Sequence, residues 1–153
     1  MKILNPDNLR GNWHGVLAAW NIVENWGHYK QTDLQLQQQL KALIISLWNE
    51  KDWTKKRHPL CKNAIEQYVD DSKYLKVIAD MANALKHGGL DLTSKHKARS
   101  DAEDTNDVGS IEHNDGISRT LYFYNFDGEV IELYELLRGA IGEYDALERM
   151  LRN

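Results

Sequence analysis

The sequence is poor in residues that cross-link or rigidify a chain. It contains one cysteine and two prolines in 153 residues, so a disulfide framework is excluded and few positions interrupt a helix. Its longest apolar run, residues 43–48, contains Ser46 and is far shorter than the roughly 20 residues that a membrane span needs. We therefore expect a single domain, 1–153, that does not enter a membrane. Because Cys61 has no cysteine partner and no secretory leader is evident, we expect a cytoplasmic location.

An excess of positive charge is also lacking. Nineteen Lys and Arg residues stand against 23 Asp and Glu residues, which gives a net charge of -4. A protein-wide field that gathers nucleic acid is therefore excluded, and any such binding requires a local basic patch.

Motifs for cofactors and metals are missing as well. Gly88-Gly89 lacks the lysine and the preceding strand of a phosphate-binding loop, and no nucleophile elbow occurs. His87, His96 and His113 do not have the spacing of a compact metal site. We expect neither a cofactor nor a metal.

Helical periodicity is the strongest signal that the sequence does contain. Apolar residues recur at spacings of three and four in five stretches, which is typical of amphipathic helices. Asn5-Pro6 and Thr32-Asp33 are predicted to begin the first two helices, and Gly88-Gly89 is predicted to end the fourth. Large aromatic residues favour the interior, so Trp13 and Trp20 are expected in the core. The expected helices cover about residues 5–27, 32–53, 59–68, 72–88 and 133–151.

Between the last two helices the sequence changes character. Residues 90–118 are polar, and 101–115 contain six acidic residues and no Lys or Arg, which predicts a solvated loop. Residues 119–126 alternate bulky side chains, and Asp127-Gly128 is a strong signal for a two-residue hairpin turn. The expected fold is mainly α: a bundle of about five helices with a polar loop and a small β-hairpin inserted at about residues 88–131, before the C-terminal helix.

Polar residues form a second stripe on the predicted fourth helix. Asp80, Asn83 and His87 recur at spacings of three and four, so they are neighbours along one ridge. Histidine exchanges protons near neutral pH, and a neighbouring amide or carboxylate can orient it, so these three residues are candidate catalytic groups. The alternative is an ordinary solvated helix face, with His87 near the negative end of the helix dipole.

Asn83-x-x-x-His87 resembles the latter part of the Arg-Asn-x-x-x-His motif of the HEPN superfamily. These helical-bundle proteins are frequent in bacterial toxin, defence and RNA-processing systems, and their paired subunits commonly form a metal-independent ribonuclease site from Arg and His across a dimer. Here Ala82 occupies the arginine position, and the tyrosine that one subgroup has two residues after the histidine is absent. The resemblance implies a protein that contacts RNA or an RNA-acting partner, with weak or absent ribonuclease activity. Residues 80–87, with Asp52-Trp53 upstream, are also similar to uncharacterised bacterial helical proteins.

Basic residues that could replace the missing arginine occur in two places. Lys55, Lys56 and Arg57 form the densest basic cluster, and Lys86 lies beside His87. Arg57 is the best substitute for the missing cation, and these four residues are the predicted nucleic-acid-binding surface. The alternative is a solvated helix end without a ligand.

A second class of function stays open. Ala79, Ala82 and Ala84 keep the fourth helix thin, which permits close approach of another helix, and the acidic run 101–115 could bind a basic partner. These features suit a non-catalytic interaction module, such as a homodimer, a subunit of an assembly or a phage-encoded inhibitor.

Overall fold

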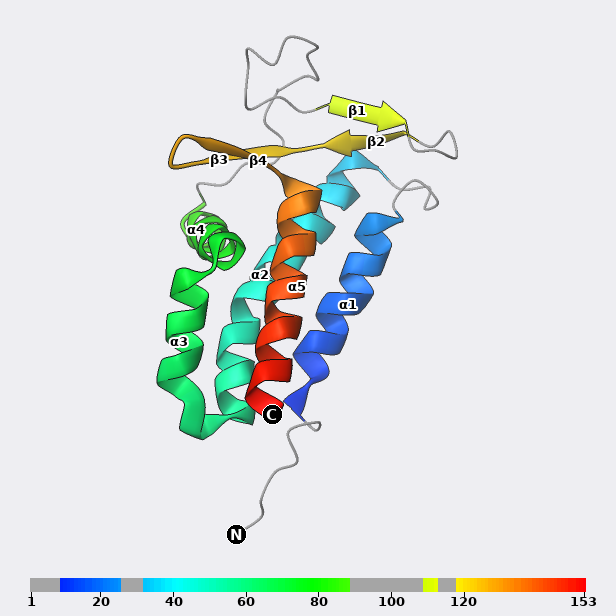
Figure 1. Ribbon diagram of the computed structural model, residues 1–153. Helices are drawn as coiled ribbons and strands as arrows, with labels where there is room; N and C mark the ends of the chain where they lie inside the picture. The colour runs from blue at the N-terminus through cyan, green and yellow to red at the C-terminus, as the bar shows by residue number, and fades with distance from the viewer. Residues whose placement is uncertain (1–8, 26–31, 89–108, 113–117) are drawn as a thin grey trace.

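The computed structural model describes residues 9–25, 32–88, 109–112 and 118–153, and these ranges form a mainly helical structure (Figure 1). Five α-helices, one 3-10 turn and two antiparallel strand pairs lie within them. The mainly α fold with a hairpin before the C-terminal helix is therefore confirmed. The elements are α1 (Gly11–Glu24), α2 (Asp33–Arg57), η3 (Pro59–Cys61), α3 (Lys62–Asp71), α4 (Lys73–Lys86), β1 (Gly109–Glu112), β2 (Ser118–Leu121), β3 (Phe123–Phe126), β4 (Glu129–Glu132) and α5 (Leu133–Arg152).

The helices pack around α2, the longest of them. In Figure 1, α1, α2 and α5 run side by side, α3 flanks α2, and α4 is seen nearly along its axis because it crosses the bundle. The strands lie across the end of the bundle at which α5 begins. Contacts of α2 with the other four helices make it the centre of the structure.

Helix α2 presents one continuous buried stripe, but its chemistry changes along the helix. Buried residues recur at alternating spacings of four and three, which keeps them on one face. Its first four members are leucines, whereas its last three are Glu50, Thr54 and Arg57. The full stripe is Leu36, Leu40, Leu43, Leu47, Glu50, Thr54 and Arg57.

The predicted core tryptophans are confirmed. Trp13 and Trp20 of α1 are 4% and 9% exposed. Trp13 packs edge-on against Tyr144 of α5, with ring centroids 6.2 Å apart at an interplanar angle of 66°. This arrangement suits aromatic pairs, since the positive edge of one ring meets the negative face of the other.

Polar caps fix where two helices begin. Thr32 and Gln35 form a reciprocal capping box at the start of α2, with N–H···O distances of 2.8 and 3.2 Å. Ser72 accepts a hydrogen bond from the amide of Leu75 at the start of α4. The cap predicted at Thr32 is therefore confirmed, and Gly88 ends α4 in the left-handed conformation that the sequence predicts.

Two helix boundaries differ from the prediction. Helix α1 begins at Gly11 rather than at Asn5-Pro6, and this dipeptide lies outside the described residues. Helix α2 continues to Arg57, past the predicted end at Trp53, because its last two turns bury polar residues that an apolar pattern does not reveal.

The predicted hairpin turn is confirmed, and a second strand pair adds to it. Strands β3 and β4 are joined by Asp127 and Gly128, whose φ angles of 52° and 80° are those of the primed turns that suit hairpins. Strand β1 pairs with β2, so residues 109–112 are strand rather than the predicted loop. The rest of the acidic run 101–115 lies outside the described residues.

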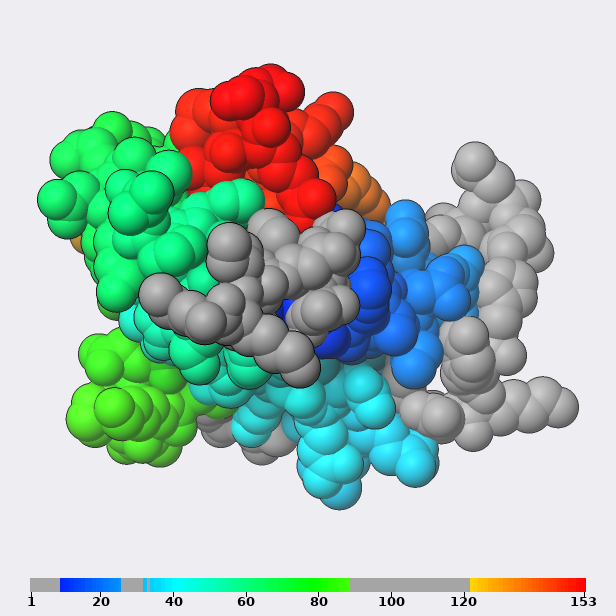
Figure 2. All heavy atoms as spheres, turned by 90° about the horizontal axis from the view of Figure 1, so that it is seen from below, coloured from blue at the N-terminus to red at the C-terminus, as the bar shows by residue number. Residues whose placement is uncertain are grey.

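A buried ionic cluster lies at the end of the bundle where α1 begins and α2 and α5 end. This end is at the bottom of Figure 1, and Figure 2 views the molecule from that side. The guanidinium of Arg57 binds the carboxylates of Glu50 at 2.6 Å and Glu148 at 2.7 Å, and donates to the carbonyl of Leu9 at 3.2 Å. Glu50 also accepts a hydrogen bond from Asn12 at 3.1 Å. One arginine therefore joins α1, α2 and α5.

Further donors hold Glu148 in its charged form. His58 and Arg152 each approach one oxygen of this carboxylate at 2.7 Å, and Arg57 binds the other. Burial alone raises the pKa of Glu148, but the hydrogen bonds from these three residues outweigh it and lower the pKa to about 2. Glu148 is therefore ionised at neutral pH.

A close approach of α4 to α5 sets the position of α4. A Cβ atom placed on Gly139 of α5 would lie 2.7 Å from the ring of Tyr74 on α4, which is too close for any side chain. Gly142, one turn further along α5, has open space around it. Only glycine at 139 permits this packing.

Within the described ranges, no helix is both long and apolar enough to span a bilayer.

Replacing Arg57 by Ala is expected to lower the free energy of unfolding by about 3–5 kcal/mol, because two carboxylates lose their buried partner. Urea unfolding of the wild type and the variant measures the change. Arg149→Ala is the matched control, since this arginine is exposed in a surface pair with Asp145 and its loss is expected to cost less than about 1 kcal/mol. Equal effects of the two changes would contradict the structural role of Arg57.

Gly139→Ala and Gly142→Ala are expected to act in opposite directions. Alanine favours a helix over glycine by about 0.8–1 kcal/mol, so Gly142→Ala is expected to stabilise the protein. Gly139→Ala is expected to destabilise it by about 1–3 kcal/mol, because the added methyl group forces Tyr74 to move. Thermal unfolding of both variants is the measurement, and a stabilised Gly139→Ala variant would refute the close packing.

Candidate functional site

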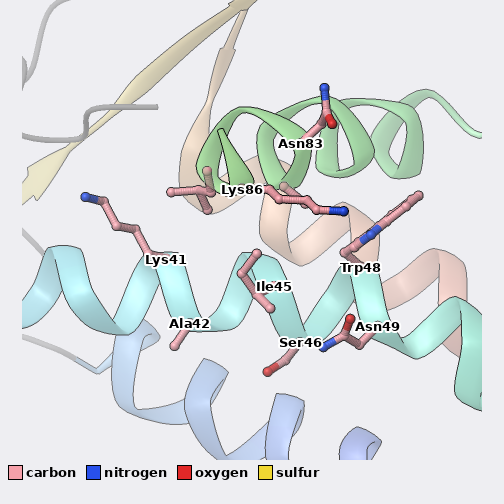
Figure 3. A pocket seen from close by; sticks show the side chains of 10 residues that line it. Lys41, Ala42, Ile45, Ser46, Trp48, Asn49, Asn83 and Lys86 are labelled. Atoms are coloured by element: carbon pink, nitrogen blue, oxygen red, sulfur yellow. The ribbon is translucent and has the colours of Figure 1, made fainter. Parts of the chain in front are cut away.

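An open groove of about 800 Å³ lies between α2 and α4 (Figure 3). Its floor is partly apolar, and its polar residues lie on both helices. Lys41 and Trp48 stand toward opposite ends of the α2 side, and the Lys86 side chain runs along α4 toward Trp48. The lining residues that carry the argument are Lys41, Ile45, Trp48, Asn83, Leu85 and Lys86.

Helical spacing explains why these residues share a groove. Lys41, Ile45 and Trp48 follow one another at spacings of four and three, on the flank of α2 beside its buried stripe. On α4, Ala82 is 2% exposed and Lys86 follows it by one helical turn. The small side chain of Ala82 leaves room beside α2, which a larger residue would fill.

The groove is positively charged in an acidic protein. Lys41 and Lys86 contribute two ammonium groups, and among the described lining residues there is no carboxylate. Trp48 adds a broad, half-buried aromatic surface. Asn83 lies at the edge of the groove, and Figure 3 shows its amide directed away from α2. The groove therefore suits a ligand with an anionic part and a flat, apolar part.

A second hollow of about 370 Å³ adjoins the groove and shares Trp48 and Asn83 with it. Lys51 and Lys76 supply positive charge here, and Phe126 of β3 supplies a second aromatic ring. The ammonium of Lys51 lies 4.3 Å from the centroid of the Trp48 ring, within the range of a cation–π contact.

The predicted polar ridge of α4 exists, because Asp80, Asn83 and His87 are all exposed. Its members have different surroundings. Asp80 accepts a hydrogen bond from the hydroxyl of Tyr124, and Asn83 lines both hollows. Burial, together with the Asp80 carboxylate, raises the pKa of Tyr124, so this hydroxyl stays protonated as the donor.

His87 forms the C-terminal cap of α4, and its amide donates a hydrogen bond to the carbonyl of Asn83 at 3.2 Å. It is not among the described residues that line either hollow. Ala82, at the position of the motif arginine, is buried. No arginine is among the described residues that line the groove.

The expectation that Arg57 replaces the missing cation is wrong. Its side chain is 1% exposed, and Glu50 and Glu148 occupy its guanidinium. A guanidinium that is buried and paired in this way is not accessible to a phosphate. Arg57 could not be recognised as buried from its neighbours in the sequence, because Glu148 lies 91 positions away.

The other predicted basic residues line two different hollows. Lys86 lines the α2–α4 groove, whereas Lys55 and Lys56 line a different hollow of about 690 Å³ with Asp52 and Lys62. Lys55 is paired with Glu66, and the ammonium of Lys56 lies 4.4 Å from the Trp53 ring centroid. The basic residues at 95, 97 and 99 lie outside the described residues.

Sequence reasoning missed Lys41 and Trp48. A signal for them was present, since Lys41, Ile45 and Trp48 form a ridge at helical spacing that mixes a cation with apolar residues. Proximity to the α4 ridge could not be inferred, because it depends on how two helices cross.

The described residues contain no group of three His, Cys, Asp or Glu side chains that could hold a metal ion. His96 and His113 lie outside these residues. Cys61 is a free thiol and is partly buried rather than fully buried.

Comparison with protein-family profiles, curated proteins and solved structures gives no match. The features of this chain that bear on function are therefore the groove and the Asn83–His87 spacing.

Proposed function

We propose that this is a HEPN-like protein that binds RNA, in a bacterial defence or toxin-related system, without effective ribonuclease activity of its own. The observation that carries the proposal is the α2–α4 groove, which Lys41, Trp48, Asn83 and Lys86 line. Asn83 belongs both to the groove and to the part of the sequence that resembles the HEPN motif.

The groove has the chemistry that RNA requires. Ammonium groups attract the phosphates of RNA whatever its base sequence. This electrostatic attraction supplies most of the affinity of non-specific complexes. Aromatic side chains such as that of Trp48 stack on unpaired bases. The positive charge of the groove allows RNA to bind although the whole chain carries a net charge of -4.

Weak or absent catalysis follows from the position of the acid–base candidate. Metal-independent cleavage of RNA needs a proton-transfer group at the 2'-hydroxyl or leaving oxygen, and a cation at the phosphate. His87 is not among the described residues that line the groove, and Ala82 offers no cation. RNA bound between Lys41 and Lys86 would therefore lack a complete catalytic set from this chain.

The double change Lys41→Gln and Lys86→Gln is expected to weaken RNA binding at least tenfold at low salt. Fluorescence anisotropy with a labelled single-stranded RNA of mixed sequence measures the affinity at several salt concentrations. Each phosphate contact with a single strand contributes about 0.7 to the slope of log K against log salt, so the slope is expected to fall by roughly 1.4.

Lys55→Gln with Lys56→Gln is the matched control for that experiment. It removes the same charge from a hollow elsewhere on the surface, and it is expected to leave the affinity within about threefold of wild type. Equal losses in both double variants would mean that the groove has no special role. Absence of binding by the wild type at low salt would refute the proposed function and favour a protein partner.

His87→Ala is expected to leave the extent of RNA cleavage unchanged. Incubating RNA in a chelating buffer with the wild type or the variant, followed by gel analysis, compares their cleavage. Because His87 does not line the groove, the variant is also expected to bind RNA as the wild type does. Cleavage by the wild type that His87→Ala abolishes would instead establish a metal-independent ribonuclease.

A further inference from the structure

We propose that the groove and the adjoining hollow form one track for single-stranded RNA, with Trp48 as the stacking platform where they meet. This inference rests on the proposed function and specifies the kind of RNA. It makes Trp48, rather than the lysines alone, the residue that distinguishes an unpaired strand from a duplex.

The first observation is that the groove and the second hollow share two lining residues. Trp48 and Asn83 line both the groove of about 800 Å³ and the hollow of about 370 Å³. Both volumes lie in the range of about 300–1,000 Å³ that is usual for sites binding small molecules, so each is large enough for a nucleotide-sized unit. A ligand that passes from one hollow to the other has to pass Trp48.

The second observation is the difference in charge between the two hollows. Among the described lining residues, the groove has two lysines and no acid, which favours phosphate. The second hollow balances Lys51 and Lys76 with Asp70 and Asp80, so its lining has no net charge. Phosphate is therefore favoured in the groove, and an uncharged base is favoured in the second hollow.

The third observation is the aromatic lining of the second hollow. Trp48 and Phe126 reach it from α2 and β3, and both are half-buried. The Lys51 ammonium lies over the Trp48 ring and also pairs with Glu66 at 3.5 Å. Stacking on aromatic side chains is a common way of binding unpaired bases, and it tolerates different sequences.

Single-stranded RNA fits these features better than a duplex. In a duplex the bases are stacked on each other and cannot enter an aromatic hollow, and proteins recognise the backbone and the minor groove instead. A track with phosphate contacts at one end and aromatic rings at the other thus selects a strand whose bases can be turned outward.

The test compares an eight-nucleotide RNA with the same strand annealed to its complement, for the wild type, Trp48→Leu and Trp48→Phe. The wild type is expected to bind the single strand at least tenfold more tightly than the duplex. Trp48→Leu is expected to lose roughly tenfold in affinity for the single strand. Trp48→Phe keeps an aromatic ring and is expected to retain most of the affinity, which separates stacking from loss of folding.

Tryptophan fluorescence adds a readout that a purely structural role would not change. Stacking of a base is expected to quench part of the emission of the wild type, and this part is expected to be absent from Trp48→Phe although the RNA still binds. Phe126→Leu is expected to weaken single-strand binding while duplex binding is unchanged, because Phe126 lines the second hollow and is not among the described residues that line the groove.

The possible failures are distinguishable. If neither form of RNA binds the wild type at low salt, the proposed function itself fails. If RNA binds through Lys41 and Lys86 but the duplex binds as well as the single strand, and Trp48→Leu has no effect, the track is refuted while the proposed function stands.

Discussion

The buried guanidinium of Arg57 is the interaction on which the arrangement of the bundle depends. It satisfies carboxylates from α2 and α5 and a carbonyl at the start of α1, so three helices meet at one charged group. A buried charge is tolerated only with such partners, because each ion loses its hydration on burial. The cluster thereby also fixes the rotation of α2 about its axis, since Glu50 and Arg57 have to face the interior.

That rotation determines what α2 presents to α4. With the stripe that ends in Glu50, Thr54 and Arg57 turned inward, the neighbouring ridge of Lys41, Ile45 and Trp48 is turned toward α4. Gly139 brings α5 close to Tyr74 and so holds α4 from its other side. The groove is thus a consequence of two packing constraints that lie outside it, one ionic and one steric.

The sequence predicted the parts of this structure that depend on local patterns. Apolar periodicity located the helices, Thr32 and Gly88 marked helix ends, and Asp127-Gly128 marked the hairpin, because each depends on residues close together in the chain. The role of Arg57 could not be predicted, since local sequence suggests an exposed basic cluster and its partner Glu148 is remote. The ridge on α4 was foreseen, but its pairing with Trp48 was not, since it requires the crossing of two helices.

We propose that RNA lies in the groove between α2 and α4. Ultraviolet cross-linking of bound RNA, followed by mass spectrometry of the cross-linked peptides, tests this placement most directly because it maps the contact without altering the protein. Cross-links are expected in the α2 segment that contains Trp48 and in the end of α4 that contains Lys86. Cross-links confined to the segment around Lys55, Lys56 and Lys62 would contradict it.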